Sequence, residues 1–224
     1  MTEKITSNQE NRLCDLFRDA TRALGLSKDE AQEIIGAGGV MQSEVKPILK
    51  KLAITDKRFG VAIREFEITV PTGYNHDTQI DTSAEKAKKE KTTYGYNSDL
   101  NSKNFAKATS KLIPGKAYIV KLFPILSRVT SEDSLTFLSK QNAILVGGQG
   151  ATLVYDVAKD QLPKGKWTVS FDEKDRLWED VVGNHRVPGV IAYSDGGFEF
   201  YLGRFGYDWL DDGVILCFCD KKEL

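Results

Sequence analysis

A glycine-rich stretch, Gly147-Gly148-Gln149-Gly150, follows the apolar run AILV and precedes ATLVYDVAKD, which is predicted to be helical. A strand-to-helix turn of this composition can hold a phosphate on Gly147, Gly148 and Gly150, because backbone N–H groups point at the anion and glycine admits close approach. The dinucleotide fingerprint is incomplete, since Leu153 stands where a small residue is needed, and no Lys-Ser or Lys-Thr follows. We interpret the stretch as a structural turn in which Gln149 is replaceable, and keep phosphate binding as the alternative.

Two cysteines, Cys217 and Cys219, lie two residues apart in the apolar run VILCFC. On a strand both thiols point to the same face, where two thiolates can begin a zinc site. Structural zinc needs four ligands, usually with wider cysteine spacing, and only His76 and His185 remain as nitrogen donors. We therefore predict no metal site and no cofactor, with both cysteines packed as small apolar residues.

Acidic residues crowd the segment FDEKDRLWED, residues 171–180. This density is typical of calcium or magnesium loops and of paired carboxylates in acid/base catalysis. The ligand order of an EF-hand is absent, and the chain has only two histidines, the residues that most often serve acid/base catalysis. We expect a solvated turn, so the sequence shows no coherent catalytic set. The acidic residues are Asp172, Glu173, Asp175, Glu179 and Asp180.

The first 57 residues are predicted to form a three-helix module. Residues 8–24 carry one apolar stripe, Ser27 begins a capping-box pattern, and Ser43 precedes a stretch with proline in its first turn. The second and third helices, separated by glycines, resemble a helix-turn-helix, but acidic residues nearly balance the basic ones, unlike in most DNA-binding modules. Contact with nucleic acid and contact with protein both stay open. The candidate contact residues are Lys46, Lys50, Lys51 and Arg58.

Residues 58–224 are predicted to form a mixed α+β domain with a mainly antiparallel sheet, because runs of strands replace strict β–α alternation. Apolar patterns predict strands in EFEITV, AYIVKLFPIL, AILV, KWTVSF, FEFYLGRF and VILCFC. Thr130 with Asp133 predicts the start of a helix, and residues 105–112 a short one. Residues 72–104 are polar and rich in lysine, which predicts a long surface loop or a partly ordered insertion.

The length, composition and net charge limit the class of protein. The chain has 224 residues, of which 41% are hydrophobic and 28% charged, with a formal net charge of -1. This composition supports a folded core, and no apolar run is long enough to span a membrane. The start lacks a secretory pattern and three cysteines do not make a disulfide scaffold, so we expect a soluble cytoplasmic protein.

Because no catalytic set is coherent, we expect a non-catalytic binding or regulatory protein that acts through protein or nucleic-acid contacts. No membrane partner is expected. The alternative is a small enzyme or nucleotide/phosphate-binding domain that uses the Gly147–Gly150 turn and the Asp172–Asp180 carboxylates.

Overall fold

The computed structural model describes residues 56–221. The predicted three-helix module, with Lys46, Lys50 and Lys51, lies outside the described residues. Within the described part, no helix is both long and apolar enough to cross a bilayer.

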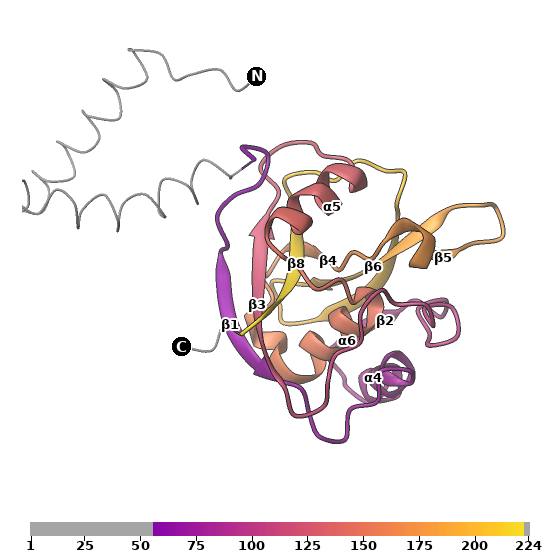
Figure 1. The fold of residues 1–224 in the computed structure, drawn as a ribbon. Coiled ribbons are helices and arrows are strands. Elements are labelled where there is room, and N and C mark those ends of the chain that lie inside the picture. The colour runs from indigo at the N-terminus through magenta and orange to yellow at the C-terminus, as the bar shows by residue number, and fades with distance from the viewer. Residues whose placement is uncertain (1–55, 222–224) are drawn as a thin grey trace, which may run out of the picture. The chain divides into compact units, whose positions relative to one another are not determined.

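One sheet of eight strands runs through the described residues, and helices pack on both of its faces (Figure 1). Seven strands follow the order β1-β3-β8-β4-β6-β7-β2, and β5 pairs with β6. The pairs β4–β8 and β2–β7 are parallel and the others antiparallel, so the α+β class is confirmed and the sheet is mixed. The strands are β1 (Arg64–Thr69), β2 (Thr93–Tyr96), β3 (Ala117–Pro124), β4 (Lys166–Val169), β5 (Trp178–Glu179), β6 (His185–Ala192), β7 (Phe198–Arg204) and β8 (Gly213–Asp220).

Helix α6 (Gly147–Ala158) covers one face of the sheet, here called the α6 face. Val120 of β3 is paired with Phe66 of β1 and Phe218 of β8, so these three side chains share a face. A Cβ atom on Gly150 of α6 would lie 3.0 Å from the Phe218 ring, which places α6 directly on this face. Farther along the sheet, Tyr155 packs edge-on against aromatic rings of β7.

Helix α5 (Ser131–Lys140) packs on the opposite face, here called the α5 face. Its Phe137 stacks on Phe59 at a centroid distance of 4.2 Å and meets Phe123 of β3 edge-on. The predicted capping box is confirmed, because Thr130 accepts from the Asp133 N–H and the Asp133 carboxylate accepts from the Thr130 N–H.

The segment 72–104 corrects one expectation. It holds helix α4 (Gln79–Ala87) and strand β2, not a long loop. Ile80, Ala84 and Ala87 are buried at helical spacing, a weak signal among polar neighbours. Gln79 and Ser83 of α4 both bind the Asp156 carboxylate of α6, so polar contacts fix α4 beside α6.

Other expectations fail at short segments. AILV forms one isolated bridge, Ile144 to Phe218, and residues 105–112 contain turns where a helix was expected. Strand β6 was not predicted because Pro188 and Gly189 interrupt its pattern, although both residues are buried inside the sheet. Two short 3₁₀ turns complete the described elements: η1 (Lys159–Gln161) and η2 (Lys174–Arg176).

Candidate functional site

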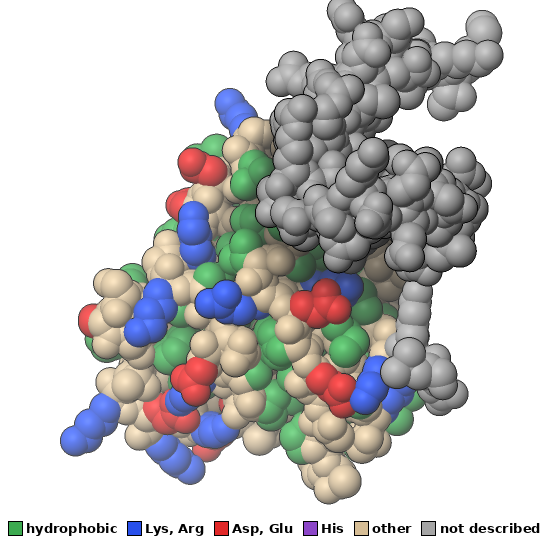
Figure 2. Space-filling model, turned by 90° about the vertical axis from the view of Figure 1, so that its left-hand side faces the viewer, with side chains coloured by type: hydrophobic (Ala, Val, Ile, Leu, Met, Phe, Trp, Pro, Cys, Tyr) green, Lys and Arg blue, Asp and Glu red, His purple; other side chains and the backbone are tan. Residues whose placement is uncertain are grey.

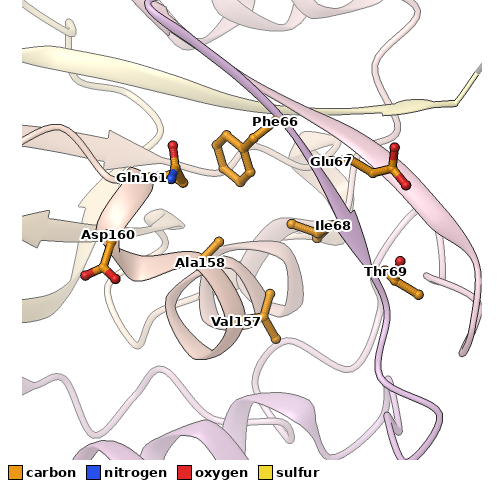
Figure 3. Close-up of a pocket in the computed structure, with 8 residues that line it drawn as sticks. All are labelled: Phe66, Glu67, Ile68, Thr69, Val157, Ala158, Asp160 and Gln161. Carbon is orange, nitrogen blue, oxygen red and sulfur yellow. The ribbon is translucent and has the colours of Figure 1, made fainter.

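A groove of about 420 Å³ lies between strand β1 and the end of α6 (Figure 3). Phe66 and Ile68 of β1 point into it from one side, and Val157 and Ala158 of α6 form the other side. Val157 is 43% exposed, so apolar surface in the groove is open to solvent. The remaining lining residues are polar: Glu67, Thr69, Asp160 and Gln161.

The groove runs beside an unpaired strand edge. Among residues 56–221, β1 pairs with β3 alone. The Val70 N–H donates to Lys116 O at 3.0 Å, so by the alternation of an antiparallel ladder the even-numbered residues of β1 bond to β3. The backbone N–H and C=O groups of Glu65, Glu67 and Thr69 consequently point outward, where a further strand can bond to them.

The outer part of the α5 face carries paired charges next to this edge. Glu65 contacts Lys121 at 3.1 Å, and Glu67 contacts Lys221 at 2.9 Å. All four groups are at least partly exposed, so each pair contributes little to stability. Figure 2 views the molecule from the β1 side, where side chains of both charges are interspersed with hydrophobic ones.

The glycine stretch is the first turn of α6, and the structure buries it. Gly147 has a φ of +46°, whereas Gly148 and Gly150 are not in the left-handed region. A Cβ atom on Gly148 would stand 2.8 Å from Ile80, and one on Gly150 would collide with Val146. Close packing against the core therefore explains glycine at these positions. Gly147, Gly148 and Gly150, the residues of the alternative phosphate site, are covered by protein atoms.

The environment of Gln149 argues against the expectation that this residue can be replaced at little cost. Its side chain is 2% exposed, and its Nε2 group donates to the Phe105 carbonyl at 2.8 Å. Gln149 lies in the first turn of helix α6 and not in an exposed loop, and this position brings its side chain into the core.

Asp172 is the buried member of the acidic segment. It is 3% exposed, and burial raises its pKa to about 6 although the N–H groups of Thr109 and Glu173 donate to it. Asp180 instead accepts from Asn184 and Arg186 in the hairpin between β5 and β6, and these hydrogen bonds lower its pKa to about 2. The structure thus separates the two ends of the segment. Within residues 56–221, no three His, Cys, Asp or Glu side chains gather closely enough to hold a metal ion.

The two histidines lie apart in the fold. His76 is 7% exposed, its Nδ1 atom is 2.8 Å from the Tyr74 hydroxyl, and burial with the nearby Lys111 charge lowers its pKa to about 4. His185 begins β6. Neither histidine is within hydrogen-bond reach of a carboxylate in the described residues, so no acid/base relay forms there.

Cys217 and Cys219 both lie on the α5 face of β8, with their Sγ atoms 3.6 Å apart. The hydrogen bond from Cys217 lowers the pKa of the Cys219 thiol, and the Lys121 charge acts in the same direction. Cys217 is buried, as expected for a small apolar residue, and Cys219 is only half-buried.

Arg58 is the one candidate contact residue in the described part. Its guanidinium binds Asp56 and Asp133, both at 2.7 Å. These contacts raise its pKa above the ordinary arginine value. The Arg58 charge is therefore balanced by two carboxylates before any partner arrives.

The described residues define an α+β protein with a mixed eight-stranded sheet. No protein family matches the chain. Neither a curated protein nor a solved structure matches it.

The groove was not predicted from the sequence. The alternation in EFEITV predicts the strand that carries Phe66 and Ile68, but this local pattern does not pair them with the end of α6. One sequence signal for the groove was available. Val157 is apolar although it lies next to Asp156, near the polar end of its helix.

Proposed function

We propose that the protein is a non-catalytic binding protein that takes up an extended segment of a partner protein along the free edge of β1. One observation carries this proposal: outward-pointing backbone groups of β1 lie beside an open, partly apolar groove. Strand addition uses such a combination, because main-chain hydrogen bonds give affinity and side-chain pockets give specificity.

The geometry of an added strand predicts which side chains the partner segment should carry. An added strand would lie ~4.8 Å from β1 and bond to Glu65, Glu67 and Thr69. Its side chains would alternate, with every second one on the α6 face next to the Phe66 and Val157 side chains. The intervening side chains would lie next to Glu65 and Glu67. The favoured segment therefore alternates apolar and basic residues.

A protein segment is favoured over a nucleic acid because of the charge beside the groove. Glu67 and Asp160 are among the residues that line it, and their carboxylates repel a phosphate backbone, with Lys221 paired to Glu67 alone. A simpler explanation for the same charges is that they protect an exposed edge from aggregation, as many native edge strands do. The two explanations differ in whether an extended peptide binds.

The test uses the full chain and a display library of random 12-residue peptides. The discriminating variant is Glu67→Pro, which removes an outward N–H group while leaving the bonds between β1 and β3 in place. Glu67→Ala is the matched control, because it removes the same carboxylate and keeps the N–H group. Affinities of selected peptides are measured by isothermal titration calorimetry, with circular dichroism as the check on folding.

We expect the selected peptides to alternate apolar and basic residues and to bind the Glu67→Ala protein about as well as the original chain. Glu67→Pro should weaken them by about tenfold or more, since one main-chain hydrogen bond contributes ~1 kcal/mol and the ring also blocks close approach. Peptides that bind the folded Glu67→Pro protein equally well would contradict strand addition. Salt-sensitive binding of a DNA or RNA oligonucleotide, measured by fluorescence anisotropy in the absence of peptide binding, would favour a nucleic-acid partner instead.

A further inference from the structure

Lys221, the last residue that the structure describes, reaches back to the strand that forms the free edge. Its Nζ atom lies 2.9 Å from one carboxylate oxygen of Glu67 and 3.1 Å from the other. Lys221 follows β8, and β3 lies between β8 and β1, so the lysine side chain crosses a whole strand to reach this carboxylate. The contact brings the end of the described chain to the proposed binding edge.

The register of the three strands explains how the lysine can cross β3. Glu67 pairs with Ile119 of β3, which pairs with Cys219 of β8, so these three side chains share the α5 face. By continuation of the same register, Lys221 lies opposite Ala117. The small Ala117 side chain leaves the lysine stem room to pass over β3 with its charged group at the edge.

Lys221 therefore contacts the carboxylate that an added strand would use. In the proposed strand addition, the intervening side chains of the partner lie next to Glu65 and Glu67. A basic side chain placed next to Glu67 would meet a carboxylate that already has a lysine on both of its oxygens. The two cations carry the same charge, so one has to leave before the other can pair fully with Glu67.

Of the two lysines that pair with β1 on this face, Lys221 is the more easily displaced. Lys121 is the direct register neighbour of Glu65, and its side chain is 24% exposed. Lys221 crosses a strand, and the side chains of Lys221 and Glu67 are 52% and 43% exposed. Solvent weakens such an exposed pair, so a binding segment can replace it at small cost.

We propose that Lys221 is an internal competitor for the strand-addition site, which holds Glu67 until a basic side chain of the partner displaces it. This inference rests on the proposed function and names the partner position that Lys221 controls. A segment with a basic residue next to Glu67 releases Lys221, whereas a segment with a neutral residue there leaves the ion pair in place.

The experiment measures peptide binding by the full chain at low ionic strength, where exposed charge pairs are least screened. The probes are a peptide selected from the 12-residue library and derivatives in which one basic residue at a time is replaced by glutamine. The variants are Lys221→Ala, Lys221→Arg, and Lys221→Ala combined with Glu67→Ala. Lys116→Ala is the matched control, because Lys116 pairs with Asp220 at 2.7 Å and not with β1. Calorimetry gives the affinities, and circular dichroism checks folding.

We expect Lys221→Ala to bind the selected peptide about two- to fivefold more tightly than the original chain, which is the range of an exposed ion pair. Lys221→Arg and Lys116→Ala should bind it as the original chain does. The gain should vanish when Glu67→Ala is added, and also with one of the glutamine derivatives, which identifies the residue next to Glu67.

Three results would overturn the proposal: no gain in Lys221→Ala, an equal gain in Lys116→Ala, or a gain that persists after Glu67→Ala. If peptides bind the original chain, lose affinity for Glu67→Pro and do not respond to Lys221→Ala, the competitor is rejected and strand addition stands. If no library peptide binds the original chain, both proposals are rejected.

Discussion

The carboxylate of Asp172 lies against the first residue of α6: its Oδ2 atom is 3.2 Å from the position that a Cβ atom on Gly147 would occupy. The start of a helix favours a negative charge, and here a side chain of the protein itself supplies it. This contact brings together the glycine stretch and the acidic segment, which the sequence links only in the nucleotide-binding alternative. The Asp172 carboxylate accepts from the N–H groups of Thr109 and Glu173, and its charge so close to the turn would repel a phosphate.

Asp172 should make the protein less stable as pH rises. Burial raises its folded-state pKa to about 6 from the usual 3.8, so the folded state holds the proton more tightly than the unfolded state. The stabilisation that comes from this tighter proton binding is fully present below pH ~4 and is lost as pH rises through ~6. The resulting decrease in the free energy of unfolding is about 3 kcal/mol at most. Urea unfolding of Asp172→Asn should lack this loss. An unchanged pH profile in that variant would show that the carboxyl is solvated.

His76 should act in the opposite direction over an overlapping range. Its folded-state pKa is lowered to about 4, so its contribution is present above pH ~6.5 and is lost as pH falls through ~4. In the Asp172→Asn protein the free energy of unfolding should therefore rise with pH between ~4 and ~6.5. His76→Asn added to Asp172→Asn should flatten that rise. A rise that persists without His76 would assign the titration to another group.

Two substitutions test how tightly the first turn of α6 is packed. Gly150→Val should lower the free energy of unfolding by about 1–3 kcal/mol, because a Cβ atom there collides with Val146 and approaches Phe218. Gln149→Ala should cost about 1–3 kcal/mol, because its hydrogen bond to the buried Phe105 carbonyl is lost. Chemical denaturation measures both.

The same turn tests the phosphate alternative. We expect no rise in the melting temperature of the original chain with millimolar ATP or NAD, since Gly147, Gly148 and Gly150 are buried. A rise that a folded Gly150→Val protein loses would move the enzyme alternative to first place.

How much of the fold could be predicted depended on where each segment lies. Alternation in EFEITV and the Thr130–Asp133 capping box are local signals, and β1 and α5 form where these signals place them. Pro188 argues against a strand when the sequence is considered locally. Strand β6 nevertheless forms around it, because pairing with neighbouring strands determines its structure, and the local sequence does not show that pairing. The groove was out of reach for the same reason: Phe66 and Val157 meet only through the packing of α6 on the sheet.

Zinc should be absent in stoichiometric amount from protein purified without added metal. Cys217 and Cys219 supply two sulfur ligands, and a structural zinc site takes four ligands. Elemental analysis measures the content. One mole of zinc per mole of chain would contradict this prediction.

A chain that begins at Thr55, just before the predicted boundary, should fold and melt cooperatively. It retains Asp56, which binds Arg58, and the core residues of the sheet and its three helices. Circular dichroism and a thermal melt check this expectation. An unfolded product would mean that residues 1–54 contribute to the same core.

Strand β8 comes last along the chain, yet β3 and β4 flank it. During synthesis the β1–β3 pair and the β6–β7 pair can form early, but no strand joins them until β8 has been made through Asp220. Such late, non-local pairing slows folding, and we expect ribosome-stalled chains that end before Gly213 to be cleaved rapidly by protease. A growing chain that stops before β8 therefore carries two sheet fragments with open edges, and these edges are exposed to incorrect strand pairing until β8 is made.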